Sequence, residues 1–245
     1  MLPSILKYSL VTLLTLTGTS STLVDAPREE YAQIWIEKVD TVPILQSWKA
    51  HFIEEDEDIT KFVSKKISLK DTNYIPPDLI AIGGIEAINE AGRIGKLRLE
   101  ARDALWKMAV EFEKQFSEPL VVISGYRSAE YQQRMWNLWK CTDTLCAPPG
   151  YSEHQLGLAV DLFDATTETE YYKNAQYRKY IAWLTLHAAE YGYSQSYQKW
   201  EYIDAYEVEP WHWRYLWVDL ATKLHKLDMT YTEYVRFEWV LDRME

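Results

Sequence analysis

The feature that most constrains the fold of this chain is a set of four polar residues that have to meet at one point. His154 and Asp161 lie seven residues apart in one segment, and Glu209 and His212 lie three residues apart in another. Two imidazoles and one carboxylate suit a catalytic zinc ion, which leaves a fourth position to water and needs a nearby carboxylate to accept the water's proton. The sequence therefore predicts a fold that brings both segments to one zinc ion.

The second segment adds a local requirement. Residues three apart on a regular strand point to opposite faces, so Glu209 and His212 can address one metal only if the chain turns between them. Pro210 lies between them and cannot donate a hydrogen bond to a strand ladder. We therefore expect Pro210 to turn the chain just before His212.

Apolar patterns predict a mixture of helices and strands. Leu120 to Ile123 form a continuous, mostly β-branched run that fits a buried strand. Ser128 is suited to cap a helix through about Asn137, which places Arg127 at a strand-to-helix junction where side chains project into sites. The other predicted elements are helices at 87–116, 177–191 and 224–245 and strands at 156–163, 193–197 and 201–208.

Composition divides the chain into four parts. Lys7 precedes an uncharged run at 8–16, which resembles a secretory signal peptide and is short for a membrane span, although an uncleaved anchor is the alternative. The charge run at 54–58 is expected to be a solvated face. The predicted parts are a signal peptide or N-terminal anchor at 1–26, an acidic stalk or helical extension at 27–73, a catalytic domain with the zinc site at 74–224 and a C-terminal helical tail at 225–245.

Charge and cysteine content limit the partners and the compartment. A net charge of -11 argues against binding nucleic acid or an anionic membrane surface through bulk charge. In an exported chain, the close pair Cys141 and Cys146 is expected to form a disulfide. The alternative is that both thiols are reduced, and it is favoured if the signal-peptide interpretation is wrong. We expect the chain in the periplasm, the cell wall or outside the cell, either free or tethered to the membrane by its N-terminal segment.

Three motifs, in their order and spacing, resemble those of one enzyme family. They are Ser-Gly-Tyr-Arg-Ser at 124–128, Ser-x-His-x-x-Gly-x-Ala-x-Asp at 152–161 and Glu-Pro-Trp-His-Trp-Arg-Tyr at 209–215. Over about residues 74–224 the chain resembles the zinc D-alanyl-D-alanine carboxypeptidases of the VanY type, within the lysostaphin, D-Ala-D-Ala peptidase and hedgehog-like fold group. The resemblance implies an α+β fold, a small antiparallel sheet with helices packed on it and the zinc site at the sheet.

The resemblance also implies roles for individual residues. One zinc ion would be bound by His154, Asp161 and His212, with Glu209 as the catalytic base and Arg127 as the cation that meets a substrate or transition-state oxygen. Substrate-facing positions would be Ser152 in the channel and, with a structural role equally open, Tyr126, Gln132 and Gln133. Ordinary structural roles are expected for His51, His187, His225, Glu153, Asp164, Trp211 and Trp213.

The implied reaction is hydrolysis of the C-terminal D-Ala-D-Ala amide of peptidoglycan stem peptides by metal-activated water. The motifs do not separate it from an L,D-carboxypeptidase or an endopeptidase of peptidoglycan, because the same apparatus attacks whichever amide the groove presents. A zinc-containing wall-binding module that does not hydrolyse is a further alternative. Such a module would be expected to lose the base or the arginine, and this chain keeps both Glu209 and Arg127. The motifs carry no indication of the oligomeric state.

Overall fold

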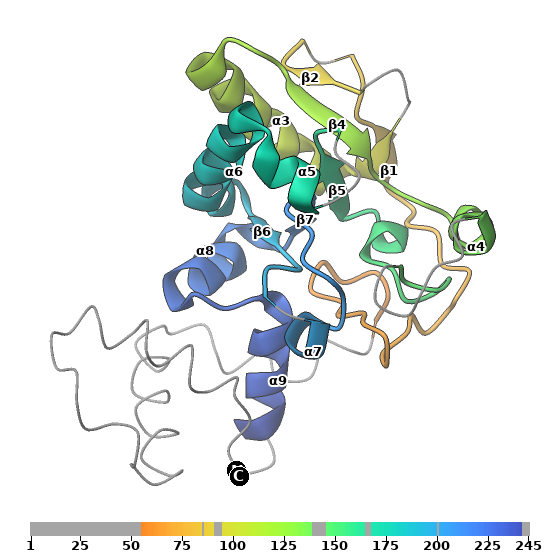
Figure 1. Cartoon of the computed structure of the whole chain (residues 1–245). Coiled ribbons are helices and arrows are strands. Elements are labelled where there is room, and N and C mark those ends of the chain that lie inside the picture. The colour runs from red at the N-terminus through yellow and green to blue at the C-terminus, as the bar shows by residue number, and fades with distance from the viewer. Residues whose placement is uncertain are drawn as a thin grey trace, which may run out of the picture. The chain divides into compact units, whose positions relative to one another are not determined.

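A five-stranded sheet lies at the centre of the computed structural model, which describes residues 55–84, 86–90, 95–138, 146–164, 168–199 and 201–241 (Figure 1). In spatial order the strands are β2 (Ile88–Asn89), β4 (Leu120–Ser124), β5 (Ala159–Leu162), β7 (His212–Tyr215) and β6 (Tyr193–Gln195). β2 runs parallel to β4, and the other neighbours are antiparallel. β1 (Leu79–Ala81) and β3 (Lys96–Arg98) form a separate antiparallel pair. The predicted small sheet with helices packed on it is confirmed, but the sheet is not wholly antiparallel as expected, because β2 and β4 are parallel.

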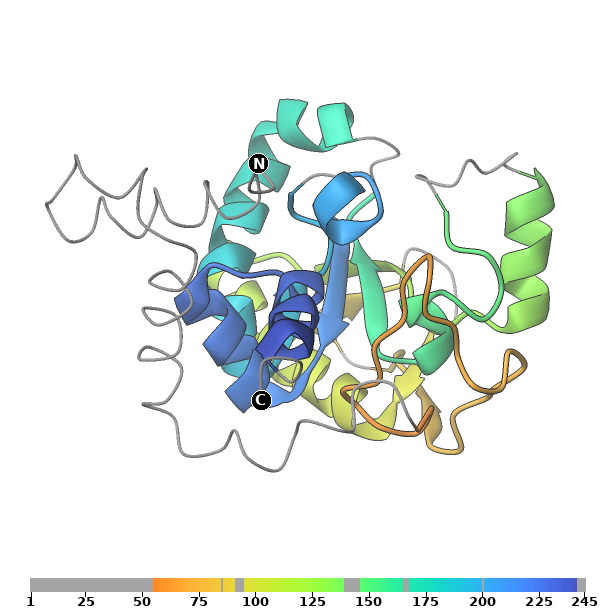
Figure 2. The ribbon, with the colours of Figure 1, turned by 90° about the horizontal axis from the view of Figure 1, so that it is seen from below.

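Helices flank this sheet. They are α3 (Leu99–Phe116), α4 (Ala129–Leu138), α5 (Glu168–Lys173), α6 (Ala175–His187), α7 (Glu201–Asp204), α8 (Trp217–Leu227) and α9 (Tyr231–Leu241), with the short 3-10 helices η3 (Glu153–Leu156) and η4 (Ala188–Tyr191). α3 packs against β4, and α8 packs against β6. Figures 1 and 2 both show α4 on the opposite side of the molecule from α6 and α8.

The core forms where the apolar stripe of α3 meets aromatic side chains of other elements. Leu105, Met108 and Phe112 follow helical spacing and are fully buried. The ring of Phe112 lies 4.9 Å from that of Tyr180 on α6 and 5.9 Å from that of Phe163, which follows β5. This packing holds β5, which carries one of the predicted metal ligands, against the rest of the domain.

Several local predictions are confirmed. The buried strand at 120–123 is β4, and the hydroxyl of Ser128 accepts a hydrogen bond from the Tyr131 amide at the start of α4. The predicted strand at 193–197 contains β6. The helix predicted to end at Gly192 consists of α6 and η4, and Gly192 has the left-handed backbone, φ 82°, that suits a helix C-terminus.

The helix predicted at 87–116 is wrong in its first third. Residues 88–89 and 96–98 are strands, and the helix begins only at Leu99. Pairing of Ile88 with Leu120 of β4 draws this part of the chain into the sheet, which overrides its helical periodicity. The strand predicted at 156–163 is only β5 at 159–162, because Leu156 belongs to η3, Gly157 caps that helix and Phe163 has a left-handed backbone with φ 65°.

The strand predicted at 201–208 is also wrong, because the chain forms α7 there. The buried carboxylate of Asp204 accepts hydrogen bonds from the backbone amides of Gln198 and Lys199, which turns the chain back on itself. The single helix predicted at 224–245 is divided into α8 and α9, since Asp228 takes a left-handed conformation with φ 52°. Hydrophobic periodicity does not reveal these turns, because they are fixed by the side-chain contacts of Asp204 and by the backbone conformation of Asp228.

Residues 55–73 belong to the domain, so the predicted boundary at residue 74 is wrong for this part of the chain. Ile59, Val63 and Leu69 are buried in the main core, and residues 51–245 form one compact unit. The predicted solvated charge run is also only partly exposed. Asp56 is 8 % exposed and lies 2.9 Å from the ammonium of the buried Lys61.

The carboxyl of Asp56 is held as an anion. Burial alone would raise its pKa, but the backbone amides of Asp71 and Lys70, together with Lys61, lower the pKa below its ordinary value. Hydrogen bonds of 2.7 Å from Asp71 and 2.8 Å from Lys70 account for this preference. Residues 55–73 are therefore attached to the rest of the domain by both apolar and ionic contacts.

Residues 225–241 are likewise part of the domain rather than a separate tail. Tyr231, Tyr234 and Val235 of α9 are buried, and the ring of Tyr231 lies 5.6 Å from that of Phe62. The leader predicted at 1–26 and Cys141 lie outside the described residues, so export and the disulfide stay predictions. Within the described ranges, no helix is long and apolar enough to cross a membrane.

Candidate active site

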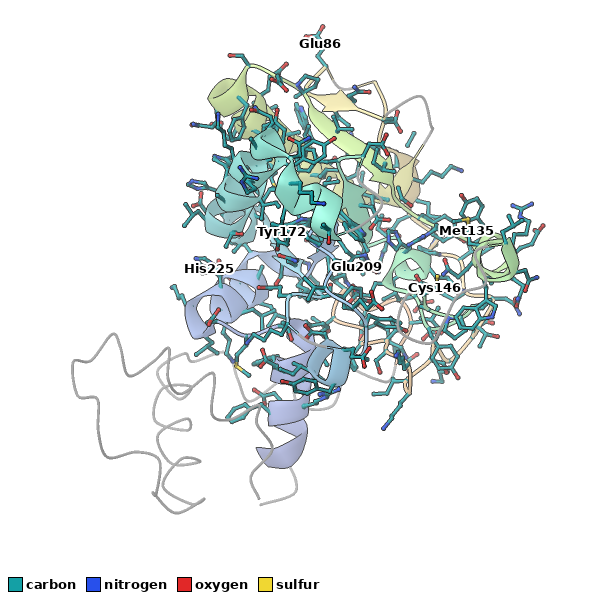
Figure 3. All side chains as sticks on the ribbon, in the orientation of Figure 1. Glu86, Met135, Cys146, Tyr172, Glu209 and His225 are labelled. Carbon is teal, nitrogen blue, oxygen red and sulfur yellow. The ribbon has the colours of Figure 1, made fainter. Side chains whose placement is uncertain are left out.

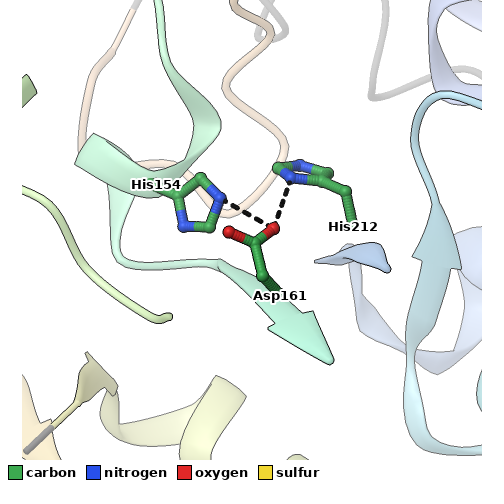
Figure 4. A group of neighbouring side chains, drawn as sticks. All are labelled: His154, Asp161 and His212. Atoms are coloured by element: carbon green, nitrogen blue, oxygen red, sulfur yellow. Dashed lines mark hydrogen bonds and ion pairs between the residues drawn. The ribbon is translucent and has the colours of Figure 1, made fainter. Parts of the chain in front are cut away.

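Three neighbouring elements carry the predicted metal ligands (Figure 4). His154 comes from η3, Asp161 from β5 and His212 from the first position of β7. The sheet register pairs Asp161 directly with His212. Gly157 joins η3 to β5 with φ 67°, and a Cβ there would lie 2.8 Å from Leu79, so only glycine makes this turn without strain. One potential ligand atom from each of the three side chains lies within 4.8 Å of the others.

The hydrogen bonds of the two imidazoles decide which nitrogen faces the centre. His154 Nδ1 lies 2.7 Å from the carbonyl of Gly125, an acceptor, so this nitrogen carries the proton. Its Nε2 is buried without a hydrogen-bond partner and lies 3.2 Å from Asp161 Oδ1. His212 Nδ1 lies at the same distance, 3.2 Å, from that oxygen. His154 Nε2, His212 Nδ1 and Asp161 Oδ1 therefore converge, and this donor set fits a zinc ion.

The electrostatics of the centre also favour a cation. Burial alone would raise the pKa of Asp161, but His154, His212 and Arg127 hold it well below its ordinary value. Burial and Arg127 lower the pKa of His154 to about 4. Burial would lower the pKa of His212 as well, but hydrogen bonds to Asp161 and Glu153 raise it to about 10. A metal ion at this point would displace the His212 proton.

Glu209 lies beside the convergent ligands because the chain turns as predicted. Pro210 and Trp211 form the turn, and the His212 amide donates to the Glu209 carbonyl over 3.2 Å. Glu209 Oε2 then lies 3.6 Å from His212 Nδ1. Burial raises the pKa of Glu209 to about 7, with His212 opposing the shift. Such a carboxyl can take up and release a proton near neutral pH. Figure 3 shows Glu209 in the middle of the molecule.

A cavity of about 200 Å³ opens on these residues. Arg127 lines it from the loop after β4, with a guanidinium nitrogen 3.7 Å from Asp161 Oδ2 and a buried Nε that has no hydrogen-bond partner. Tyr197 and Tyr206 line another part of the wall. The cavity therefore brings the carboxyl of Glu209 and the guanidinium of Arg127 to the same space as the three convergent side chains.

Only some of the predicted substrate-facing residues line the cavity. Ser152 lines the cavity, and its hydroxyl accepts a hydrogen bond from the His154 amide that caps η3. Tyr126 and Gln133 are not among the lining residues, and Gln133 is exposed on α4. Gln132 lines the cavity instead, with Nε2 donating to the Ala147 carbonyl over 2.8 Å and a buried, unpaired Oε1.

Glu153 is the residue at this centre whose role the sequence analysis missed. A solvated or capping role was expected, but the side chain is 4 % exposed and its Oε2 lies 2.8 Å from His212 Nε2. Burial alone would raise its pKa, but the hydrogen bond from His212 and the charge of Arg214 hold it below the ordinary value. The signal in the sequence that could have indicated this role was its position directly before the predicted ligand His154. Among the other residues given structural roles, Trp213 donates its indole N–H to the Pro210 carbonyl and His187 pairs with Glu190. Trp211, in contrast, lines the cavity beside the convergent side chains, and His51 lies outside the described residues.

The chain has the fold of the LdcB LD-carboxypeptidase and of VanY-type enzymes. A sequence model of the VanY family, described as D-alanyl-D-alanine carboxypeptidase, matches residues 95–218. The chain belongs to this family of carboxypeptidases.

Relatives and solved structures agree with the assignment. The chain is 32% identical over 189 residues to YodJ of Bacillus subtilis (strain 168), which is named as a carboxypeptidase, covering 74% of this chain and 68% of YodJ. It is 35% identical over 136 residues to a D-alanyl-D-alanine carboxypeptidase of Enterococcus faecalis (strain ATCC 700802 / V583), covering 48% of each.

Among solved structures, the LdcB LD-carboxypeptidase superposes with a TM-score of 0.62 at 32% identity, covering 74% of this chain and 87% of LdcB. A vancomycin-resistance D,D-pentapeptidase VanY in complex with Zn(II) superposes with a TM-score of 0.52 at 22% identity, covering 71% of this chain and 97% of that structure. At this identity the VanY structure shows the shared fold alone.

Proposed function

We propose that this chain is a zinc-dependent carboxypeptidase that removes the C-terminal D-alanine of peptidoglycan stem peptides, with D-Ala-D-Ala as its bond. The observation that carries the proposal is the convergence of His154 Nε2, Asp161 Oδ1 and His212 Nδ1 on one cavity that also holds Glu209 and Arg127. Membership of the VanY family and the E. faecalis relative support the choice of bond.

The three convergent side chains would hold the metal. When bound, zinc would supply polarisation of the scissile carbonyl and a water of lowered pKa. The buried Nε2 of His154, which has no hydrogen-bond partner, is best explained by such a ligand.

Glu209 is placed to act as the base. Its carboxylate accepts a proton from the attacking water, whose oxygen forms the new bond to the carbonyl carbon. The same proton then passes to the amine nitrogen as the C–N bond breaks, so free D-alanine leaves as an amine. The raised pKa of Glu209, about 7, suits a group that both accepts and returns a proton.

Arg127 is placed to bind negative charge at the same cavity. Its guanidinium has a buried Nε that is unpaired, so donor capacity is available toward the cavity. A carboxypeptidase needs a cation for the free C-terminal carboxylate, and a developing oxyanion gains from the same donors. Retention of both Glu209 and Arg127 speaks against a binding module that does not hydrolyse.

A second candidate activity is L,D-carboxypeptidase, which releases D-alanine from a tetrapeptide stem. The similarity to the LdcB LD-carboxypeptidase, with a TM-score of 0.62 at 32% identity, favours it. Both activities use the same metal ligands, base and arginine, and differ only in the residue that the cavity accepts before the scissile bond.

Digestion of defined stem peptides tests the proposal and separates the two activities. The purified chain would be given a pentapeptide ending in D-Ala-D-Ala, the corresponding tetrapeptide and a crosslinked dimer, with chelator and with zinc restored. Chelator-sensitive release of D-alanine from the pentapeptide supports the proposal, and release from the tetrapeptide alone supports the second candidate. Cleavage of the crosslink without D-alanine makes the chain an endopeptidase, and no turnover by zinc-loaded protein refutes hydrolysis.

The proposed substrate in the mature wall lies outside the cytoplasmic membrane. We therefore propose that the chain is exported, as the leader-like residues 1–26 predict. Cell fractionation of a tagged full-length chain tests export, and recovery of the chain in the cytoplasm alone contradicts it.

A further inference from the structure

We propose that Glu153 is a positioning residue that holds His212 in the orientation and tautomer that metal binding requires. The inference rests on the proposed metal-dependent function and deepens it. Glu153 contacts none of the reacting atoms directly, so its effect would be exerted through His212.

The contact between the two side chains is direct and buried. Glu153 Oε2 lies 2.8 Å from His212 Nε2, and the exposed fractions of the two side chains are 4 % and 3 %. A neutral imidazole carries one proton, and the acceptor beside Nε2 holds that proton there. The lone pair of Nδ1 is then directed toward Asp161, where the other ligand atoms converge. Removing the acceptor would leave both the ring angle and the tautomer unspecified.

Other groups hold the carboxylate of Glu153 in place. The Ser196 hydroxyl donates to Oε2 over 2.6 Å, and an Arg214 nitrogen lies 3.6 Å from Oε1. A carboxylate buried without partners would be strongly disfavoured, so these contacts offset its desolvation. Glu153 is therefore restrained in position and charge before a metal arrives.

Arg214 connects this arrangement to the N-terminal segment. The side chain is fully buried, and one of its nitrogens donates to the carbonyls of Ile59 and Lys61 over 2.7 and 3.1 Å. Its Nε donates to the Tyr215 carbonyl over 3.1 Å. A continuous line of contacts thus runs from residues 59–61, through Arg214 and Glu153, to the imidazole of His212. Residues 59–61 precede the family-matched range 95–218.

The geometry of η3 explains how adjacent residues serve two ligands. A 3-10 helix has three residues per turn, so consecutive side chains point about 120° apart. His154 and Glu153 can therefore face different sides, one toward the metal and the other toward β7. One short turn thus carries the first predicted ligand and the carboxylate that contacts the third, and a carboxylate that accepts from a ligating histidine is common at zinc sites.

The test measures zinc affinity by competition with a chromophoric chelator, using the full chain. Glu153→Gln keeps the side-chain shape and a neutral amide acceptor but removes the charge that strengthens the hydrogen bond from His212 Nε2, so it is expected to weaken zinc binding by about tenfold to a hundredfold. Glu190→Gln is the matched control, because Glu190 also hydrogen-bonds a histidine, His187, over 3.0 Å but is 61 % exposed and lies outside the cavity. The control should bind zinc like the wild type.

A second variant keeps the test decisive if Glu153→Gln does not fold. Ser196→Ala removes one donor to Glu153 and leaves the charge, so it should weaken zinc binding to a lesser degree than Glu153→Gln. ¹⁵N NMR of the zinc-bound His212 imidazole should show one tautomer in the wild type. In Glu153→Gln it should show a mixture of tautomers or a shifted signal. A purely structural role would lower the unfolding midpoint of the metal-free protein and leave zinc affinity and the imidazole signals unchanged.

The outcomes distinguish the inference from the proposed function. If the wild type binds zinc and the folded Glu153 and Ser196 variants bind it equally well, the positioning role is refuted and the proposed function stands. If the folded wild type does not bind zinc at all, the proposed function fails and the positioning role fails with it.

Discussion

Replacing Glu209 by glutamine tests the assignment of the base. Its carboxylate lies in the cavity, 3.6 Å from His212 Nδ1, and burial raises its pKa to about 7. Glutamine keeps the shape of the side chain but cannot accept a proton from water. General-base catalysis contributes about 10² to 10⁴ in rate, so kcat/KM should fall by that factor, or about 3 to 5 kcal/mol of transition-state stabilisation.

The assay is the initial rate of D-alanine release from the preferred stem peptide, with zinc content measured on the same samples. Glu209 is not one of the three convergent ligands, so Glu209→Gln should hold zinc at the wild-type ratio. His212→Ala is the comparison variant and should lose both zinc and activity. A folded, zinc-loaded Glu209→Gln protein that keeps activity within about tenfold of wild type refutes the assignment, because a loss so small is below the range for a general base.

Three further predictions concern Arg127 at the cavity, Asp56 in the segment 55–73 and Phe112 in the core. Arg127→Ala should lower kcat/KM by about a hundredfold without loss of zinc, and Arg127→Lys should recover only part of it; an unchanged rate in Arg127→Ala would contradict its role. Asp56→Asn should lower the free energy of unfolding at pH 7 by about 3 kcal/mol, since it removes the negative charge 2.9 Å from the buried ammonium of Lys61. Because the pKa of Asp56 is lowered in the folded state, its stabilisation is present above the ordinary value of 3.8 and is lost as pH falls through the folded-state pKa, so urea titrations of wild type and variant should converge in acid. Phe112→Ala should cost about 3 to 5 kcal/mol in urea unfolding, and a cost below about 1 kcal/mol would show that its fully buried ring does not organise the core.

Much of the candidate site could be predicted because its residues lie in short, ordered segments. The ligand types, their spacing and the position of Pro210 required a turn beside a strand, and the structure places Glu209 next to His212 through that turn. Arg127 was expected at the exit of a buried strand, and it lines the cavity from the end of β4. These inferences needed only local geometry and the chemistry of zinc ligands.

Substrate-facing side chains were harder to predict. Gln132 and Gln133 are neighbours on one helix, so a sequence pattern alone gives both about equal weight. Only the packing of α4 against the segment that carries Ala147 buries Gln132 at the cavity and leaves Gln133 exposed. The same limit applies to Tyr197 and Tyr206, which enter the cavity wall from a region without a recognisable motif.

The sequence by itself determined which residues could serve as metal ligands, base and cation, and where the main strand-to-helix junction lies, because each inference depends on residue type and spacing within a few residues. Only the tertiary structure decided that Glu153 lies within hydrogen-bond distance of His212, 59 residues away, and that Arg214 donates to the carbonyl of Ile59, 155 residues away. It also decided that residues 55–73 belong to the domain. The reason is physical: a buried charge is stable only beside particular partners, and folding brings those partners together from distant parts of the chain.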